Sequence, residues 1–182
     1  MPPNFWEEDK VDYLKQFVIP FRGLKNDIHH FDFVIDRKFF DAIEYAELKD
    51  GLVHVGLDME KQDRMMIFDF DFTGYMEVEC DRCLDIFKQD LEGHRRLIVN
   101  FGEAFEEQSD DIIIIPEGEY AFDVSTYIYE HINLLLPMQR IHPDDEKGNS
   151  TCNPEMLQRL SSLDIEQEVD PRWDVLKKLK EK

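Results

Sequence analysis

Hydrophobic and polar residues alternate with a period of two along much of the first half of the chain. Phe31, Phe33 and Ile35 occupy every second position, and a similar pattern returns over residues 53–59 after a turn at 49–51. Alternation of this kind is typical of a β-strand with one face buried and the other in water. We therefore predict a strand over each of these segments.

The longest alternation covers residues 66–80. Apolar side chains occupy the even positions except Gly74, and acidic or polar ones occupy most of the odd positions. At about 3.3 Å per residue, such a strand is too long to stay flat in a small domain, so we predict a bend or bulge at Gly74. The pattern indicates a strongly curved antiparallel sheet or a partly closed barrel. It leaves Cys80 at the strand end, where a hairpin can place Cys83 beside it.

Two further strands are predicted, one over residues 97–101 and one over 112–115, with an acidic loop at 103–111 between them. From Phe101 to Glu130 the chain has nine acidic residues and no Lys or Arg. A charge run of this kind usually forms a solvated face, and a docking surface is the alternative interpretation.

The second half of the chain changes to helical periodicity. Apolar residues over 124–135 recur at i, i+3 and i+4, with Asp123 as the expected N-cap and Pro137 as the end of the helix. Asn153-Pro154 carries the signature of a second helix start. Asp170-Pro171 repeats this signature and predicts a last helix.

The predicted fold class is α+β. We expect a curved antiparallel β-sheet or partly closed barrel in the N-terminal half and two to three helices in the C-terminal half. Residues 1–160 are expected to form a single domain, and residues 161–182 a linker and a C-terminal helix. With 182 residues and a hydrophobic content of 42%, the chain can bury one sizeable core.

The aromatic residues of the alternating segments are expected to belong to that core. Their neighbours along the strands are largely acidic, and an acidic surface repels RNA rather than stacking its bases. The residues concerned are Phe31, Phe33, Phe68, Phe70 and Phe72.

The charge of the chain is strongly negative. Against 21 Lys and Arg stand 41 Asp and Glu, a formal net charge of −20. Such a surface repels phosphate backbones, so any RNA contact is not expected to depend on net charge. It would attract a basic protein, for which a ribosomal protein is the commonest candidate. The plainer interpretation is that acidity only keeps the protein in solution.

The N-terminal sequence does not have the pattern of a signal peptide, and no apolar run approaches the length of a membrane span. We therefore expect a cytoplasmic protein that does not contact a membrane. An odd number of cysteines also favours a reducing compartment, in which Cys80-x-x-Cys83 is a metal or redox pair.

All three cysteines of the chain can contribute to one metal site. Cys80 and Cys83 have the spacing of a zinc knuckle, Cys152 is the remaining thiol, and His142 is the nearest imidazole. His94 and His54 are rival fourth ligands. Three thiolates and an imidazole complete a tetrahedral zinc set, but buried free cysteines without a metal remain an alternative. A redox role is less favoured, because the flanks of the pair indicate strands rather than a helix N-terminus.

Candidate binding residues are few. Arg82 lies inside the Cys80–Cys83 turn, where a rigid guanidinium suits phosphate or carboxylate. A local salt bridge to a neighbouring carboxylate is the favoured interpretation. Arg95 and Arg96 form a compact basic patch with His94. Common nucleotide-binding, metalloprotease, hydrolase and deaminase motifs are absent from the sequence, so we expect no catalytic residues and no small-molecule substrate.

Residues 78–87 contain Cys80-Asp-Arg82-Cys83 followed by apolar and aromatic residues, and residues 123–137 form an acid-capped helix ending in Leu-Pro. With the trailing His142 and Cys152, this order resembles the YceD-like family, whose members are needed for accumulation of large-subunit ribosomal RNA in bacteria and plastids. The resemblance covers about residues 65–155. It departs from some relatives, which carry several more cysteines after the Leu-Pro.

The resemblance implies a non-enzymatic factor for production of the large ribosomal subunit, with a ribosomal protein or the pre-ribosomal large subunit as partner. A structural zinc at Cys80, Cys83, His142 and Cys152 accompanies this interpretation. Two alternatives stay open: a zinc-dependent RNA hydrolase or nuclease, with three protein ligands and a water, and a metal-free, acidic, chaperone-like protein.

Overall fold

The computed structural model describes residues 13–163 of the chain. These residues form two compact units. We call residues 13–79 and 86–140 the sheet unit, and residues 80–85 and 141–163 the Cys-His unit.

The sheet unit is built on one six-stranded sheet. Its strands, in spatial order, are β2 (Ile28–Ile35), β3 (Asp50–Lys61), β4 (Met65–Glu79), β5 (Ile86–Gly102), β7 (Ile112–Pro116) and β6 (Glu106–Ser109). All neighbours pair antiparallel except β5 and β7, which are parallel. The fold class is therefore mixed α+β with a mostly antiparallel sheet, as the alternation predicted.

The sheet is open, so the prediction of a partly closed barrel was wrong. Closure would need the edge strands β2 and β6 to pair, and among the described residues each pairs with only one neighbour. The β6 strand has only four residues, all exposed and half of them glutamates. It is too short and too polar to close a sheet. The segment 103–111, predicted as a loop, therefore contains an edge strand.

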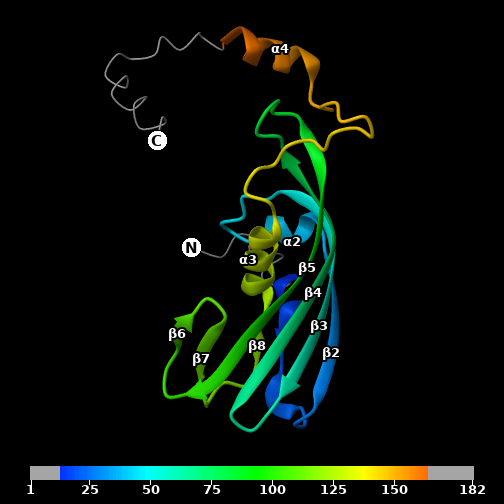
Figure 1. Ribbon diagram of the computed structural model, residues 1–182. Coiled ribbons are helices and arrows are strands. Elements are labelled where there is room, and N and C mark those ends of the chain that lie inside the picture. Colours follow the sequence, from blue (N-terminus) through cyan, green and yellow to red (C-terminus); the bar gives the residue numbers. More distant parts are fainter. Residues whose placement is uncertain (1–12, 164–182) are drawn as a thin grey trace, which may run out of the picture. The chain divides into compact units, whose positions relative to one another are not determined.

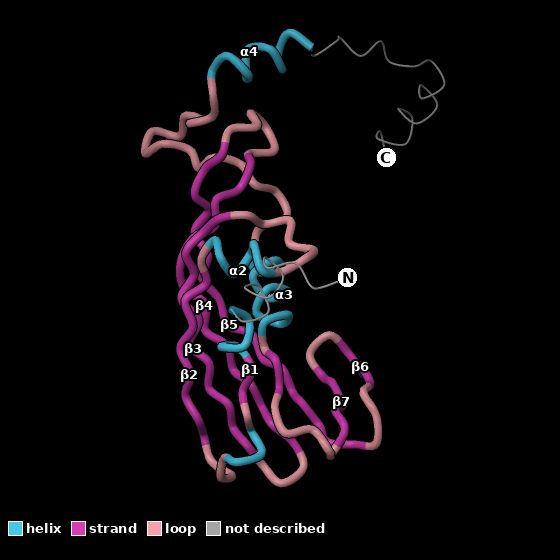
Figure 2. Tube along the Cα trace, turned by 180° about the vertical axis from the view of Figure 1, so that it is seen from behind, coloured by secondary structure: helices cyan, strands magenta, loops and turns pink. Residues whose placement is uncertain are grey.

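Two helices of this unit, α2 (Arg37–Ala42) and α3 (Ser125–Leu135), lie against the same face of the curved sheet (Figures 1 and 2). The short pair β1 (Val18–Ile19) and β8 (Phe122–Asp123) forms a separate two-stranded sheet. Single turns of 3-10 helix, Lys15–Phe17 and Phe21–Gly23, flank β1.

The sequence pattern located α3 but not α2. The N-cap residue is Val124 and not Asp123, so the predicted cap was one residue too early. The Asp123 carboxylate still accepts a hydrogen bond of 2.8 Å from Ser125 N at the start of α3, and the helix ends two residues before Pro137. In contrast, α2 lies in the N-terminal half, where only strands were predicted. It has six residues and is capped by Asp36, whose carboxylate accepts from Lys38 N. A helix this short has too few turns to produce a recognisable periodicity.

The core lies between the sheet and these helices. The even-numbered side chains of β4 are buried, including Met66, Phe68, Phe70 and Phe72, whereas their odd-numbered neighbours are exposed or half-buried. Phe31 and Phe33 of β2 are partly buried and pack against the same core. The prediction that these aromatic residues form the core is therefore confirmed.

Two glycines allow close approaches within this packing. A Cβ at Gly74 would collide with the carbonyl oxygen of Leu52 on the adjacent strand β3. The pairing of β4 with β3 and with β5 runs through Gly74 without a shift of register, so the predicted bulge was wrong and the glycine serves strand packing instead. At Gly93 of β5, a Cβ would collide with the side chain of Leu135 on α3. The absence of a side chain at Gly93 therefore allows α3 to lie close to the sheet.

In the Cys-His unit, α4 (Pro154–Leu163) begins at the predicted residue. Asn153 Oδ1 accepts from Glu155 N at 3.0 Å and caps the helix. The helix continues to Leu163, three residues into the segment predicted as a linker. The rest of that linker and the predicted last helix lie outside the described residues, so the proposed domain division stays a prediction. Among residues 13–163, no helix has the length and apolar character needed to cross a membrane.

Candidate functional site

The first half of the candidate site is the turn Cys80–Asp85, which connects β4 to β5. Cys80 N donates to the carbonyl oxygen of Asp85 at 3.0 Å, and Leu84 N donates to the carbonyl oxygen of Cys80 at 2.9 Å. Leu84 closes the turn with a φ of 64°, in the left-handed region. The turn folds Cys80 and Cys83 toward each other, as the spacing of the pair predicted.

The second half is the segment from His142 to Cys152. Asp144 and Ser150 form an isolated antiparallel bridge, and Gly148 adopts a φ of 79° at the turn between them. The Asp145 carboxylate accepts from Lys147 N at 2.9 Å and from Asn149 N at 2.8 Å. Hydrogen bonds from the Asn149 side chain are the main cause that lowers the pKa of Asp145. The folded segment presents its first and last residues to the same site.

Two polar contacts join these halves. Arg82 Nη1 donates to Ser150 Oγ at 3.3 Å, and Asn153 Nδ2 donates to Asp85 Oδ2 at 3.1 Å. Arg82, predicted as a binding residue, therefore has a partner within the Cys-His unit. These contacts hold the turn against the segment that leads into α4.

The four predicted ligands meet between the two halves. One ligand atom from each of Cys80, Cys83, His142 and Cys152 lies within 4.8 Å of every other. The Sγ atoms of Cys80 and Cys152 are 3.8 Å apart, and His142 Nδ1 lies 3.5 Å from Cys83 Sγ and 3.8 Å from Cys152 Sγ. Ligands bound at about 2.0–2.3 Å around a tetrahedral ion lie about 3.5–3.8 Å from one another. The three distances therefore have the spacing of a tetrahedral Cys₃His set.

The surroundings of the sulfurs favour thiolate at one position. Burial alone would raise the pKa of Cys80, but backbone N–H groups of Cys83, Arg82 and His142 donate to its sulfur and lower the pKa to about 6. Burial is also the largest cause at Cys83, where it raises the pKa, with the neighbouring cysteine side chains adding to the effect. A cation among the sulfurs would favour the deprotonated form of all three.

All three cysteines are buried and free of disulfides. Thiolates with one imidazole are a ligand set that zinc and other thiophilic metals prefer over calcium or magnesium. The rival ligands His54 and His94 belong to β3 and β5 of the sheet unit and are not members of the cluster. Of the histidines considered from the sequence, the structure thus brings His142 to the cysteines.

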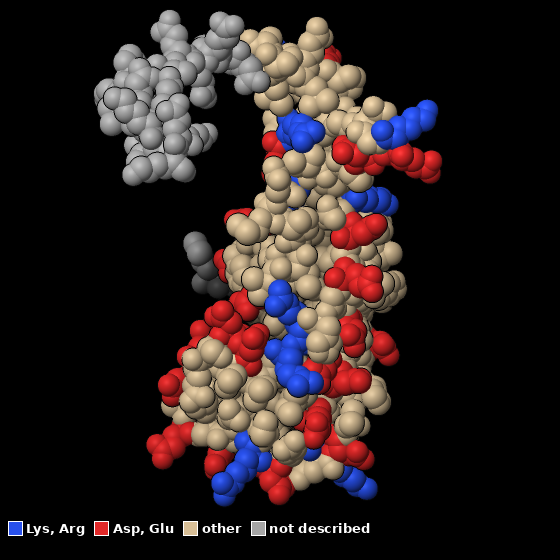
Figure 3. Space-filling model, viewed as in Figure 1, with Lys and Arg blue, Asp and Glu red and all other residues tan. Residues whose placement is uncertain are grey.

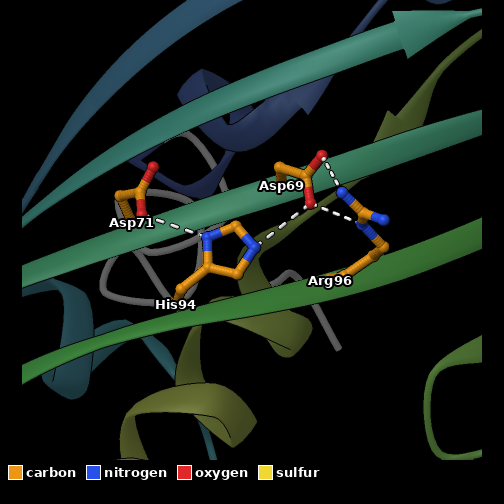
Figure 4. Close-up of polar contacts among 4 residues, drawn as sticks. All are labelled: Asp69, Asp71, His94 and Arg96. Carbon is orange, nitrogen blue, oxygen red and sulfur yellow. Dashed lines mark hydrogen bonds and ion pairs between the residues drawn. The ribbon is translucent and has the colours of Figure 1, made fainter.

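A second group of charged residues lies on the exposed face of β4 and β5 (Figure 4). Arg96 forms two hydrogen bonds with the Asp69 carboxylate, at 2.7 and 3.0 Å. His94 lies between two carboxylates, with Nδ1 3.0 Å from Asp71 and Nε2 3.3 Å from Asp69. Arg96, a predicted binding residue, is therefore held by a bidentate ion pair.

Arg95 lies on the opposite face of β5, toward α3. Its Nη2 donates to the carbonyl oxygen of Leu134, near the C-terminal end of that helix, at 3.4 Å. The two neighbouring arginines thus point to different faces of the sheet and do not form one patch. A binding role for Arg82, Arg95 and Arg96 stays a prediction.

Reasoning from the sequence missed the residues that support the ligands. Asp85, Ser150 and Asn153 hold the two halves together, but their types are common in turns and their spacing has no period. Of these three residues, only Asn153 was predicted to have a structural role, as the N-cap of a helix. Its hydrogen bond to Asp85 could not be predicted from that role. Their position within two residues of Cys83 or Cys152 is the signal that would have pointed to them.

Comparison with known proteins gives two matches. The family model described as "Large ribosomal RNA subunit accumulation protein YceD" matches residues 68–180, a segment that includes the whole Cys₃His cluster. "Uncharacterized protein YlbN" of Bacillus subtilis (strain 168) is 28% identical to the chain over 119 residues, which are 65% of this chain and 68% of that protein. No solved structure matches the chain.

Proposed function

The chain belongs to the YceD family of large ribosomal RNA subunit accumulation proteins, and from this membership we propose that it is a non-enzymatic factor in biogenesis of the large ribosomal subunit. Its role is to support accumulation or processing of large-subunit ribosomal RNA in the cytoplasm. The observation that carries the proposal is the family match over residues 68–180, which includes every residue of the candidate metal centre.

The proposal includes a structural zinc ion held by Cys80, Cys83, His142 and Cys152. The donor types, the burial of the three thiols and the three ligand-to-ligand distances of 3.5–3.8 Å support it. The ion would link the turn 80–85 to the segment 141–163, which contains only one described helix and few buried apolar residues. In a unit with so small a core, metal binding contributes directly to the free energy of folding.

A closed ligand set also separates this role from that of a hydrolase. Catalytic zinc sites have three protein ligands and leave a position for water, whereas four protein ligands leave none. His142 Nδ1 lies as close to the sulfurs of Cys83 and Cys152 as a fourth ligand would. This geometry favours the structural role over the alternative of a zinc-dependent RNA hydrolase or nuclease.

The proposed partner is a basic protein of the large subunit or of its precursor. A net charge of −20 would oppose approach to free RNA but favour approach to a protein rich in Lys and Arg. Contact with RNA is then secondary and does not depend on net charge. A metal-free, acidic, chaperone-like protein would share this charge but would not need the Cys₃His cluster.

Affinity purification from a native lysate at low salt, with and without complete nuclease digestion, tests the proposal. Enrichment of large-subunit precursors in the undigested arm supports the assembly role. A basic ribosomal protein that stays bound after digestion identifies a protein partner, whereas loss of all binding with the RNA contradicts a protein contact. A capture with neither large-subunit RNA nor large-subunit proteins would refute the assembly role.

A further inference from the structure

The sheet unit contains a cavity that the proposed function does not use. It has a volume of about 780 Å³ and is lined by α3, by the β6–β7 hairpin and by the segment that follows α2. Several of its residues come from the acidic run at 103–130 that the sequence singled out as a possible docking surface. All of them belong to the sheet unit.

Four carboxylates line this cavity: Glu47, Glu107, Asp110 and Glu130. None of them makes an ion pair with another residue in the described part of the chain, and no described Lys or Arg lines the cavity. Figure 3 shows acidic side chains gathered between α3 and the β6–β7 hairpin. The cavity is therefore a hollow lined by carboxylates that have no ion-pair partner among the described residues.

Neighbouring groups respond to this charge. Burial and the nearby Glu107 carboxylate raise the pKa of Glu130. Burial, followed by Glu130, Glu107 and Asp123, raises the pKa of Tyr127 to about 12. Both shifts mean that further negative charge is disfavoured at this place, and a cation would relieve both.

Aromatic rings form another part of the wall. Tyr45, which is 58% exposed, meets Tyr129 in an edge-to-face contact with ring centroids 5.6 Å apart. Tyr129 is fixed in turn because its hydroxyl oxygen accepts from Glu47 N at 2.9 Å. Tyr127 also lines the cavity. Aromatic faces beside carboxylates are the setting in which proteins bind ammonium and guanidinium groups.

A buried histidine on α3 marks the same cavity. His131 is only 3% exposed, and neither of its ring nitrogens has a hydrogen-bond partner. Its ring packs edge-to-face against Phe70 and Phe72. A polar side chain without a partner is uncommon inside a protein and points to a functional environment rather than to packing alone.

One resident cation lies near the cavity without lining it. Arg95 donates to the carbonyl oxygen of Leu134, and its charge contributes to the low pKa of His131 after the larger effect of burial. One guanidinium stands against four carboxylates, so the neighbourhood stays net negative.

We propose that this cavity is a docking site for a cationic side chain, an arginine or lysine of a basic protein segment. The inference rests on the proposed function only for the origin of that segment, a basic protein of the large subunit. Four carboxylates supply the attraction and orient the group, and the tyrosines bind its flat or apolar part. The cavity is large enough for one such side chain and the adjoining backbone.

The direct test titrates the full chain with a capped peptide in which three arginines alternate with glycine, followed by calorimetry. The control peptide carries citrulline in place of arginine, which keeps the shape and removes the charge. The variant Glu107→Gln/Glu130→Gln is compared with Glu79→Gln/Glu92→Gln, whose exposed carboxylates on β4 and β5 do not line the cavity. Both variants change the net charge by the same amount.

We expect the arginine peptide to bind, the citrulline peptide not to bind, and the cavity variant to lose about tenfold in affinity while the control variant loses much less. Tyr45→Leu is expected to weaken binding as well, and circular dichroism of each variant checks that the fold is retained. No binding by the natural chain, or equal losses in the two double variants, would overturn the inference.

Failure of the docking site can be distinguished from failure of the proposed assembly role. If the arginine peptide does not bind, or if the two double variants lose affinity equally, while the natural chain still captures large-subunit material, the docking site is wrong and the assembly role stands. If the peptide binds in the cavity but no large-subunit material is captured, the docking site stands and the assembly role is wrong.

Discussion

The Sγ atom of Cys83 lies 3.5 Å from Nδ1 of His142, although 59 residues separate the two along the chain. Most of those intervening residues belong to the sheet unit, yet both groups belong to the Cys-His unit. The contact therefore gathers distant parts of the sequence into one small site. Few buried apolar residues are available in this unit to hold these parts together. Polar contacts and, in our proposal, a metal ion hold them instead.

Removal of one ligand is expected to release the metal. In Cys152→Ser, the zinc content of the purified chain should fall from about one ion per molecule toward zero, because a hydroxyl is a far weaker zinc ligand than a thiolate. Elemental analysis measures this content. His54→Asn, which alters a histidine outside the cluster, is the control and should keep its zinc. A Cys152→Ser protein with undiminished zinc would exclude this cysteine from the site.

Replacement of Leu84 by glycine in the turn 80–85 is expected to stabilise the fold. Leu84 holds a φ of 64° and is 59% exposed, so its side chain contributes little burial while its backbone is strained. Leu84→Gly should raise the free energy of unfolding by about 1 kcal/mol, since glycine adopts this conformation without a steric cost. Chemical denaturation of the zinc-loaded protein measures the change. A loss of stability instead would mean that the exposed leucine makes a contact worth more than the strain.

The approach of α3 to the sheet depends on Gly93. Because an added Cβ would meet the side chain of Leu135, Gly93→Ala is expected to lower the free energy of unfolding by about 1–3 kcal/mol. Gly56→Ala on β3 is the matched control, since no atom lies within 4 Å of its added Cβ. Thermal unfolding compares the two. Similar melting temperatures for both variants would contradict the close packing of helix and sheet.

Acid is expected to destabilise the sheet unit through His131. Burial is the main cause that lowers its pKa to about 4, with Arg95 adding to the effect, whereas the pKa in the unfolded chain is about 6.5. The unfolded chain therefore binds the proton more readily. The full stability is present above about pH 6.5 and is lost as the pH falls toward 4, by up to about 3 kcal/mol.

The variant His131→Leu isolates this effect from that of the many carboxylates. Denaturation curves between pH 4 and pH 8 should show a stability difference between the natural chain and the variant that grows as the pH falls below about 6.5. The leucine also removes two buried nitrogens that lack partners, so the variant is expected to be at least as stable at neutral pH. A difference that does not change with pH would mean that His131 titrates normally in the folded protein.

The sheet was predictable because its signal is local. On β4 the even positions except Gly74 are buried and the odd ones are not. The sequence pattern therefore predicted the strand, its two faces and the approximate position of its end at Cys80. The openness of the sheet was not predictable, because it depends on whether β2 and β6 meet. The role of Gly74 was not predictable either, since it depends on the adjacent strand β3.

The candidate metal centre was predictable to the level of its ligand types. Three cysteines leave few choices for thiol ligands, but the choice among His54, His94 and His142 needed the fold. The cavity beside α3 could not be predicted from the sequence. Its carboxylates come from three separate segments, and the acidic run revealed only that charge was concentrated there.

The central claim, a role in accumulation of large-subunit ribosomal RNA, is tested most directly by the ratio of large-subunit to small-subunit ribosomal RNA in cells that lack this protein. We predict that the ratio falls, that the natural chain restores it, and that Cys152→Ser restores it less well at equal protein abundance. A ratio that is unchanged by loss of the protein would contradict the account.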